Sequence, residues 1–300
     1  MRVVPLLAPS SSQPAATALK PVTLPRPLAL WHLASLDAPT VAVVWSLAFA
    51  WSTGLHLQWW IPIVQALGAW TVYVADRLLD ARRALLNGAT DTLRERHYFH
   101  WRRRRILLPL ALVAAFVCAV MIFVFMPVTA RERNSVLAVA TLAYMARVHA
   151  ADEKKHADRQ ARLPFLTKEL LVGILFTAGC ALPALAQAIA SNRQSWLVAL
   201  PALFFAALAW LNCYAIDRWE SPGPPSAAVA CAAIACAACG CVLAGALALS
   251  HPKSCALAVA GTLSCLLLAL LDRSRRRLSP LALRASADLV LLTPVILLLR

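Results

Sequence analysis

The sequence predicts an all-α integral membrane protein with nine transmembrane helices. Of its 300 residues, 61% are hydrophobic and 14% are charged, and the mean hydropathy is +0.68. Soluble domains have about one quarter charged residues, so this balance is typical of a chain that exposes apolar side chains to lipid. The apolar residues form runs of about bilayer length, and basic residues cluster between alternate runs.

The chain is predicted to divide into an N-terminal segment and a membrane domain. Residues 1–30 contain six prolines and the run Ser10-Ser11-Ser12, which predicts a flexible N-terminal segment. This segment lacks an apolar stretch with basic flanks and a small-residue cleavage site, so we expect no cleaved signal peptide. Residues 31–300 are predicted to form one polytopic domain, whose first span acts as the membrane signal.

Nine apolar stretches are predicted to cross the membrane, of which the fourth and the ninth are the shortest. They are residues 38–54, 59–75, 106–126, 134–147, 169–190, 196–216, 227–249, 255–271 and 285–299.

The basic residues predict the orientation of these spans. If the N-terminus is on the cytoplasmic side, the segments on that side contain 24 Lys and Arg residues and the opposite segments contain five. The positive-inside rule then places the N-terminus in the cytoplasm and the C-terminus across the cell (inner) membrane. Topology and anionic lipid headgroups account for the net charge of +15, so nucleic acid binding is not expected.

A short pattern occurs twice at the ends of predicted spans. Residues 73–77 read Tyr-Val-Ala-Asp-Arg and are followed by Asp80, and residues 214–218 read Tyr-Ala-Ile-Asp-Arg and are followed by Glu220. Both copies fall on the cytoplasmic side, after the second and sixth spans. Four spans separate them, which predicts a parallel repeat of two four-helix halves plus a ninth helix.

The acids of the two copies are candidate metal ligands. If each helix continues, the tyrosine and both acids of a copy lie on one helical face. Two such acidic stripes at a membrane edge repel each other unless a cation lies between them. Mg²⁺ uses carboxylates, water and substrate phosphate oxygens, so we expect a Mg²⁺ site. Its ligands would be Asp76, Asp80, Asp217 and Glu220.

A second interpretation of these acids is structural. Asp76 and Asp217 each lie beside arginines in the sequence, and interfacial ion pairs with those arginines are common. The candidate partners are Arg77, Arg82, Arg83 and Arg218.

The span order and the placement of both acidic motifs resemble the UbiA-type intramembrane prenyltransferases, over roughly residues 30–300. Residues 164–173, Pro-Phe-Leu-Thr-Lys-Glu-Leu-Leu-Val-Gly, add to the resemblance. The first motif of the family reads Asn-Asp-x-x-Asp-x-x-x-Asp. Residues 76–80 match its final part, whereas Val72 and Tyr73 stand at its first two positions, which makes this chain a divergent member. The second motif retains Asp217 and Glu220.

The resemblance implies an enzyme that transfers an isoprenoid chain from a prenyl diphosphate to an aromatic or lipid-like acceptor within the membrane. It implies Mg²⁺ as cofactor, held by the four acids, and basic partners for the diphosphate. Candidates are Arg159, Arg162 and Lys168. Tyr73 and Tyr214 would either face the substrate or lie in the interfacial aromatic belt.

A non-catalytic, lipid-binding or transport protein with the same fold and a degenerate acidic motif is the alternative function. The departure at Val72 and Tyr73 favours it. The position of the acids at the membrane edge disfavours a transporter, because secondary transporters place their coupling carboxylates near the midplane.

Four further features of the sequence have ordinary structural interpretations. Residues 95–105 mix aromatic and basic side chains and predict an amphipathic segment at the headgroups, or a cap over the site. Residues 149–156 place two histidines and two acids on one face, and nearby lysines favour a solvated helix. Asp288 is expected to pair with Arg284 at i and i+4, and Asp37 to start a helix.

Overall fold

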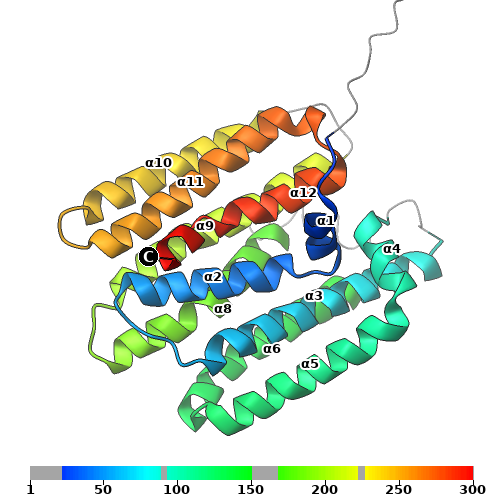
Figure 1. The fold of residues 1–300 in the computed structure, drawn as a ribbon. Coiled ribbons are helices and arrows are strands. Elements are labelled where there is room, and N and C mark those ends of the chain that lie inside the picture. The colour runs from blue at the N-terminus through cyan, green and yellow to red at the C-terminus, as the bar shows by residue number, and fades with distance from the viewer. Residues whose placement is uncertain (1–21, 89–92, 151–167, 222–226, 300) are drawn as a thin grey trace, which may run out of the picture.

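The computed structural model describes residues 22–88, 93–150, 168–221 and 227–299. In these ranges the chain is helical, and strand-like pairing is confined to a single bridge between Val22 and Leu278. An all-α fold, as the sequence predicts, is therefore confirmed. Figure 1 shows the long helices lying side by side, so that chain turns lie at two opposite ends of the bundle.

Each predicted apolar stretch corresponds to a helix or a broken helix. The helices are α1 Arg26–Leu33, α2 Asp37–Ser52, α3 Trp60–Leu86, α4 Glu95–Arg102, α5 Arg104–Phe125, α6 Val128–Ala150, α8 Lys168–Ala190, α9 Trp196–Glu220, α10 Ala228–Leu247, α11 Pro252–Ser274, α12 Pro280–Leu289 and α13 Val295–Leu298, with 3-10 turns η2 Arg275–Arg277 and η3 Val290–Leu292.

Six helical segments of the described chain are long and apolar enough to cross a membrane, and the number is seven if the bent pair α1 and α2 counts as one span. The helices α3 and α6 do not meet the same test. The predicted number of nine spans is thus not reached by composition alone. The reason in α3 is that polar and charged side chains, including Gln65, Asp76 and Arg77, lie along the helix.

The chain enters the bundle through a sharp bend. The axes of α1 and α2 differ by 86° at the break between them. Ser35 in this break has φ of +58°, in the left-handed region that non-glycine residues rarely adopt. Helical structure begins at Arg26, inside the predicted N-terminal segment, and Val22 is hydrogen-bonded to the η2 turn.

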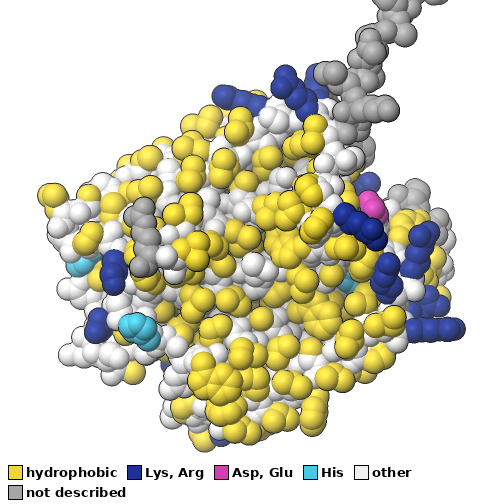
Figure 2. Space-filling model, in the orientation of Figure 1, with side chains coloured by type: hydrophobic (Ala, Val, Ile, Leu, Met, Phe, Trp, Pro, Cys, Tyr) yellow, Lys and Arg dark blue, Asp and Glu magenta, His cyan; other side chains and the backbone are white. Residues whose placement is uncertain are grey.

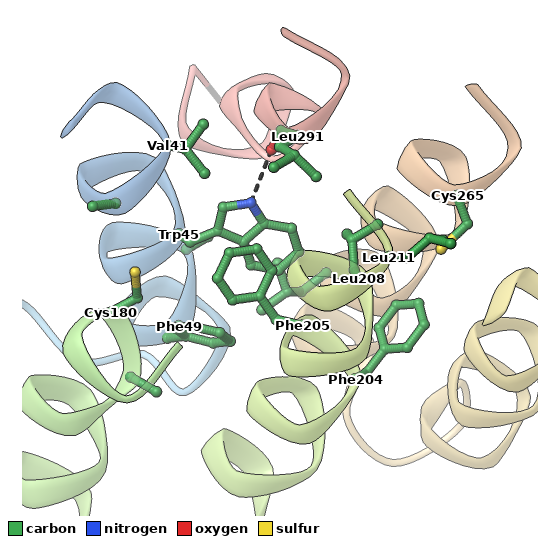
Figure 3. Close-up of a cluster of buried hydrophobic side chains, with 14 of the residues drawn as sticks. Val41, Trp45, Phe49, Cys180, Phe204, Phe205, Leu208, Leu211, Cys265 and Leu291 are labelled. Atoms are coloured by element: carbon green, nitrogen blue, oxygen red, sulfur yellow. Dashed lines mark hydrogen bonds between the residues drawn. The ribbon is translucent and has the colours of Figure 1, made fainter. Parts of the chain in front are cut away.

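An aromatic cluster joins the middle of the bundle. Trp45 of α2 stacks on Phe205 of α9, with ring centroids 3.9 Å apart and planes inclined by 19°. The indole Nε1–H of Trp45 donates to the carbonyl of Leu291 at 2.8 Å (Figure 3). Leu291 lies in η3, the turn that directly follows α12. A buried Trp N–H requires such an acceptor. The bond therefore ties the broken last helix to the centre.

The outer surface is suited to lipid. Phe116 and Phe123 of α5 are 69% and 71% exposed, and Val136 and Leu142 of α6 are 71% and 68% exposed. Figure 2 shows apolar side chains over most of the visible face, with Lys and Arg gathered mainly at the end where α4 and η2 lie. Contiguous apolar exposure of this extent marks a membrane surface. The structure therefore supports a multi-pass membrane protein.

The helices α8 and α9 pack so closely at Gly173 that a larger residue does not fit. A Cβ atom there would lie 2.9 Å from the backbone nitrogen of Trp210 and 3.2 Å from the carbonyl oxygen of Ala206. These are backbone atoms, so the clash cannot be relieved by a side-chain rotation. Small residues at such crossings let helix backbones approach in lipid.

We expect Gly173→Ala to destabilise the protein by about 1–3 kcal/mol, because α8 and α9 must move apart. The measurement is the thermal unfolding midpoint in detergent micelles. Gly179→Ala is the matched control, since it lies on the same helix with nothing within 4 Å of the added carbon. Equal midpoints for the two variants would contradict the close approach.

Candidate functional site

The two Tyr-x-x-Asp-Arg copies have the same local geometry. In α3 the guanidinium of Arg77 lies 5.8 Å from the ring centre of Tyr73, and in α9 Arg218 lies 5.8 Å from Tyr214. Their surroundings differ, because Arg77 is 4% exposed whereas Arg218 is exposed. The repeat is therefore equivalent locally, and the tertiary packing gives each copy its own environment.

Three of the predicted metal-binding acids lie near other acids of the bundle. Tyr144 of α6 lies within electrostatic range of Asp76, Asp80 and Glu169. Asp217 of α9 lies within electrostatic range of Glu169 and of Lys168, the first residue of α8. Helices α3, α6, α8 and α9 thus bring these groups toward one end of the bundle. Glu169 belongs to the stretch of residues 164–173 noted in the sequence, but the sequence analysis assigned it no role.

Glu220, the fourth predicted ligand, is held by arginines. Its Oε1 lies 2.6 Å from Arg284 Nη1 and 3.2 Å from Arg96 Nη1, and its Oε2 lies 3.9 Å from Arg94 Nε. These contacts join α9 to α12 and to α4. The arrangement fits a structural ion-pair network more closely than an open metal ligand.

The four predicted acids do not form a compact metal cage in the described structure. No three of them offer oxygens within 4.8 Å of one another. Mg²⁺ is bound through one or two carboxylates plus substrate oxygens, so a compact cage is not required.

Helix α4 covers residues 95–102 of the segment 95–105 that was predicted to be amphipathic, and both of its histidines are buried. His97 Nδ1 accepts from the backbone N–H of Arg94 at 3.1 Å, so in the neutral ring the proton is on Nε2. That nitrogen lies 3.8 Å from Asp80 Oδ2. Burial, with the nearby charges of Arg96 and Arg77, lowers the pKa of His97 to about 3.

A buried chain of hydrogen bonds runs from α3 through the α1–α2 break to α4. Arg77 Nε donates to Ser35 Oγ at 2.8 Å, and Ser35 Oγ lies 3.3 Å from His100 Nε2. His100 Nδ1 donates to the carbonyl of Arg96 at 2.8 Å, because a carbonyl only accepts. Nε2 is then the acceptor for the Ser35 hydroxyl. Burial lowers the pKa of His100 to about 4, an effect that the charge of Arg77 reinforces.

A second buried cluster lies where α1, α2 and α12 meet. His32 Nδ1 lies 2.6 Å from Asp37 Oδ2 and 3.4 Å from Asp288 Oδ2. Asn212 of α9 donates to Asp288 Oδ1 at 3.1 Å. The predicted pairing of Asp288 with Arg284 is wrong, since Arg284 bonds Glu220 instead. Asp37 begins α2 as predicted, and its Oδ1 accepts from the N–H of Ala38 at 2.9 Å.

The remaining predicted residues have mixed outcomes. Tyr73 lies within electrostatic range of Cys213, Asp37 and Asp288. Tyr214 stacks on Trp210, with ring centroids 5.4 Å apart. Arg159, Arg162 and most of residues 149–156 lie outside the described residues. The sequence analysis did not predict a role for His32 or Ser35. The one feature of the sequence that could have pointed to them is that each is a polar residue just before a predicted span.

Comparison with known proteins identifies no relative: no family model, no curated protein and no solved structure matches the chain.

The histidines of α4 predict a loss of stability in acid. Their pKa values in the folded protein lie below the ordinary value of 6.5, so the unfolded chain binds more protons between those values. The contribution of these histidines to stability is fully present above pH 6.5. It falls as the pH approaches their pKa values in the folded protein, about 4 for His100 and about 3 for His97. We expect the unfolding midpoint in micelles to drop between about pH 7 and about pH 4.5.

His100→Asn tests this assignment, because the asparagine N–H can still donate to the Arg96 carbonyl and the variant cannot take up a proton. It should show a smaller drop in midpoint than the wild type. The control is His56→Asn, at an exposed position, which should keep the full drop. An unchanged pH dependence in His100→Asn would contradict the role of His100.

Proposed function

We propose that this protein transfers an isoprenoid chain from a prenyl diphosphate to an aromatic or lipid-like acceptor, with Mg²⁺ as cofactor. The observation that carries the proposal is that acids from α3, α8 and α9 lie toward one end of an apolar bundle, with Lys168 beside them. A diphosphate with an apolar chain matches such a place, because its headgroup needs cations at the membrane edge and its chain needs lipid-like surroundings.

The nine-helix membrane plan is part of the proposal. The helices α3 and α6 have 27 and 23 residues, long enough to cross a bilayer of about 30 Å at 1.5 Å per residue. Their polar positions would face the bundle interior and the substrate. We further propose that the basic end of the bundle is cytoplasmic, because Lys and Arg gather there.

The carboxylates fit a hard cation. Asp76, Asp80 and Asp217 supply oxygens from two helices, and Glu169 supplies another, which suits the oxygen preference of Mg²⁺. When bound with the substrate, Mg²⁺ supplies positive charge that stabilises the departing diphosphate. Glu220 has a different role in this proposal: it pairs with Arg96 of α4 and Arg284 of α12 and so joins these two helices to α9.

The protein groups around the reacting centre have distinct tasks. Lys168 would pair with the diphosphate as the C–O bond to the prenyl chain breaks. The aromatic faces of Tyr73, Trp210 and Tyr214 would stabilise the resulting allylic cation. An acceptor carbon or oxygen then forms the new bond to the prenyl carbon and loses a proton. The apolar bundle keeps water from capturing the cation.

A non-catalytic lipid-binding or transport protein is the second candidate function. It is favoured by the engagement of Glu220 with three arginines and by the absence of a compact cage among the four predicted acids. Such a protein would bind a prenyl diphosphate or a similar lipid without breaking its C–O bond.

The deciding experiment measures Mg²⁺-dependent release of diphosphate from prenyl diphosphates of several chain lengths by the purified protein in lipid nanodiscs. We expect Asp76→Asn and Asp217→Asn each to lower the rate by about 10²–10³-fold, because each removes negative charge that holds the cation and the headgroup. Their unfolding midpoints should stay near that of the wild type, which separates lost chemistry from lost fold.

Glu132→Gln is the matched control. Glu132 is exposed and lies near the start of α6, whereas Tyr144 lies toward its end, so this variant should keep the full rate. Binding of a prenyl diphosphate without any release by the wild type would reject the enzyme and favour the non-catalytic protein.

A further inference from the structure

The cluster of His32, Asp37 and Asp288 brings two kinds of metal-binding atom together in a buried place. One imidazole nitrogen and one oxygen from each carboxylate all lie within 4.8 Å of one another. They come from α1, α2 and α12: the first two helices follow each other directly in the sequence, and the third lies near the C-terminal end of the chain. His32 and Asp37 are each 1% exposed. Among the described residues, no other such group of three occurs.

The hydrogen bonds around the cluster leave its inward atoms available. Asp37 uses Oδ1 for the N–H of Ala38, and Asp288 uses Oδ1 for the amide of Asn212. The Oδ2 atoms of both carboxylates are directed at His32 Nδ1. In metal sites the atoms that do not bind the ion are held by neighbouring donors in this way, which orients the ligands.

The imidazole lies against both carboxylates but is poorly aligned for hydrogen bonds with them. His32 Nδ1 lies 2.6 Å from Asp37 Oδ2, yet neither carboxylate lies in the direction in which a ring N–H can donate, so Nδ1 is buried without a hydrogen-bond partner. A buried nitrogen without a partner is costly. A metal ion bound among Nδ1 and the two Oδ2 atoms, with small shifts of these side chains, would give each of them a partner.

Charge balance supports the same occupant. Two carboxylates in an apolar bundle repel each other strongly unless positive charge lies near them. Arg77 lies within electrostatic range of Asp37 and Arg284 within range of Asp288, but Arg77 also faces Asp76 and Arg284 is paired with Glu220. A divalent ion would neutralise Asp37 and Asp288 completely, whereas a single proton on His32 would neutralise only half of their charge.

We propose that His32, Asp37 and Asp288 bind a divalent first-row transition-metal ion such as Zn²⁺. An imidazole with two carboxylates suits these ions, and the imidazole disfavours Mg²⁺, which prefers oxygen ligands alone. Three protein ligands leave at least one position open for water or a small ligand. Asn212 Oδ1, buried without a partner, is the acceptor that a metal-bound water would use. This site is separate from the Mg²⁺ acids and does not depend on prenyl transfer.

The test uses the full-length protein in detergent, stripped with a chelator, reloaded with Zn²⁺ and desalted, with no prenyl diphosphate present. We expect about one Zn²⁺ per chain by elemental analysis, and a Co²⁺-loaded sample should show visible absorption that Zn²⁺ abolishes. His32→Gln and Asp288→Asn should lose the ion, and Asn212→Ala should bind it about 10- to 100-fold more weakly.

His56→Gln is the matched control, because it removes an exposed histidine and should keep full metal content. Wild-type protein that retains no more Zn²⁺ than His32→Gln would overturn the proposal, as would equal loss in His56→Gln. If His32→Gln does not fold, the Co²⁺ spectrum of the wild type decides, and its absence overturns the site in favour of an imidazolium between two carboxylates. Because the readout is metal content, a failure of the prenyl transfer assay leaves this result unaffected.

Discussion

The sharp bend at Ser35 determines which polar groups of this protein are buried together. A left-handed backbone at a non-glycine residue costs about 1–3 kcal/mol and persists only where its surroundings hold it. Here the Ser35 hydroxyl accepts from Arg77 and faces His100, so two other helices hold the bend in place. The bend then brings His32 of α1 back against Asp37 of α2 and Asp288 of α12. The polar end of the bundle follows from this geometry.

The apolar surroundings make each buried charge depend on a partner. Glu220 shows the consequence, because its pairing with Arg94, Arg96 and Arg284 links α4, α9 and α12. The matched Tyr-x-x-Asp-Arg copies show the same principle. Their local geometry is equal, yet one arginine is buried in a hydrogen-bond chain and the other is exposed. Helix periodicity sets the first property and the packing of distant helices sets the second.

The candidate site was only partly predictable. Asp76, Asp80 and Asp217 stood out because acids are rare in this chain and because their motif repeats. Glu220 was singled out by the same argument, but no rule of spacing along α9 could show that Arg284, 64 residues later, lies 2.6 Å from it. The preferred pairing of Arg284 with Asp288 was wrong for a related reason. Neighbours at i and i+4 are within reach on a helix, but a closer partner on another helix replaces them.

The sequence by itself determined that the protein is an all-α membrane protein, where its long helices lie, and that its acidic motifs lie in the C-terminal halves of two of them. Those properties depend on composition and periodicity, which are local and additive along the chain. The tertiary structure alone decided that His32, Asp37 and Asp288 meet, that Ser35 joins Arg77 to His100, and that Glu220 is held by arginines. These contacts join residues from different helices: the first two lie at the bend between α1 and α2, and the third depends on how α4, α9 and α12 pack.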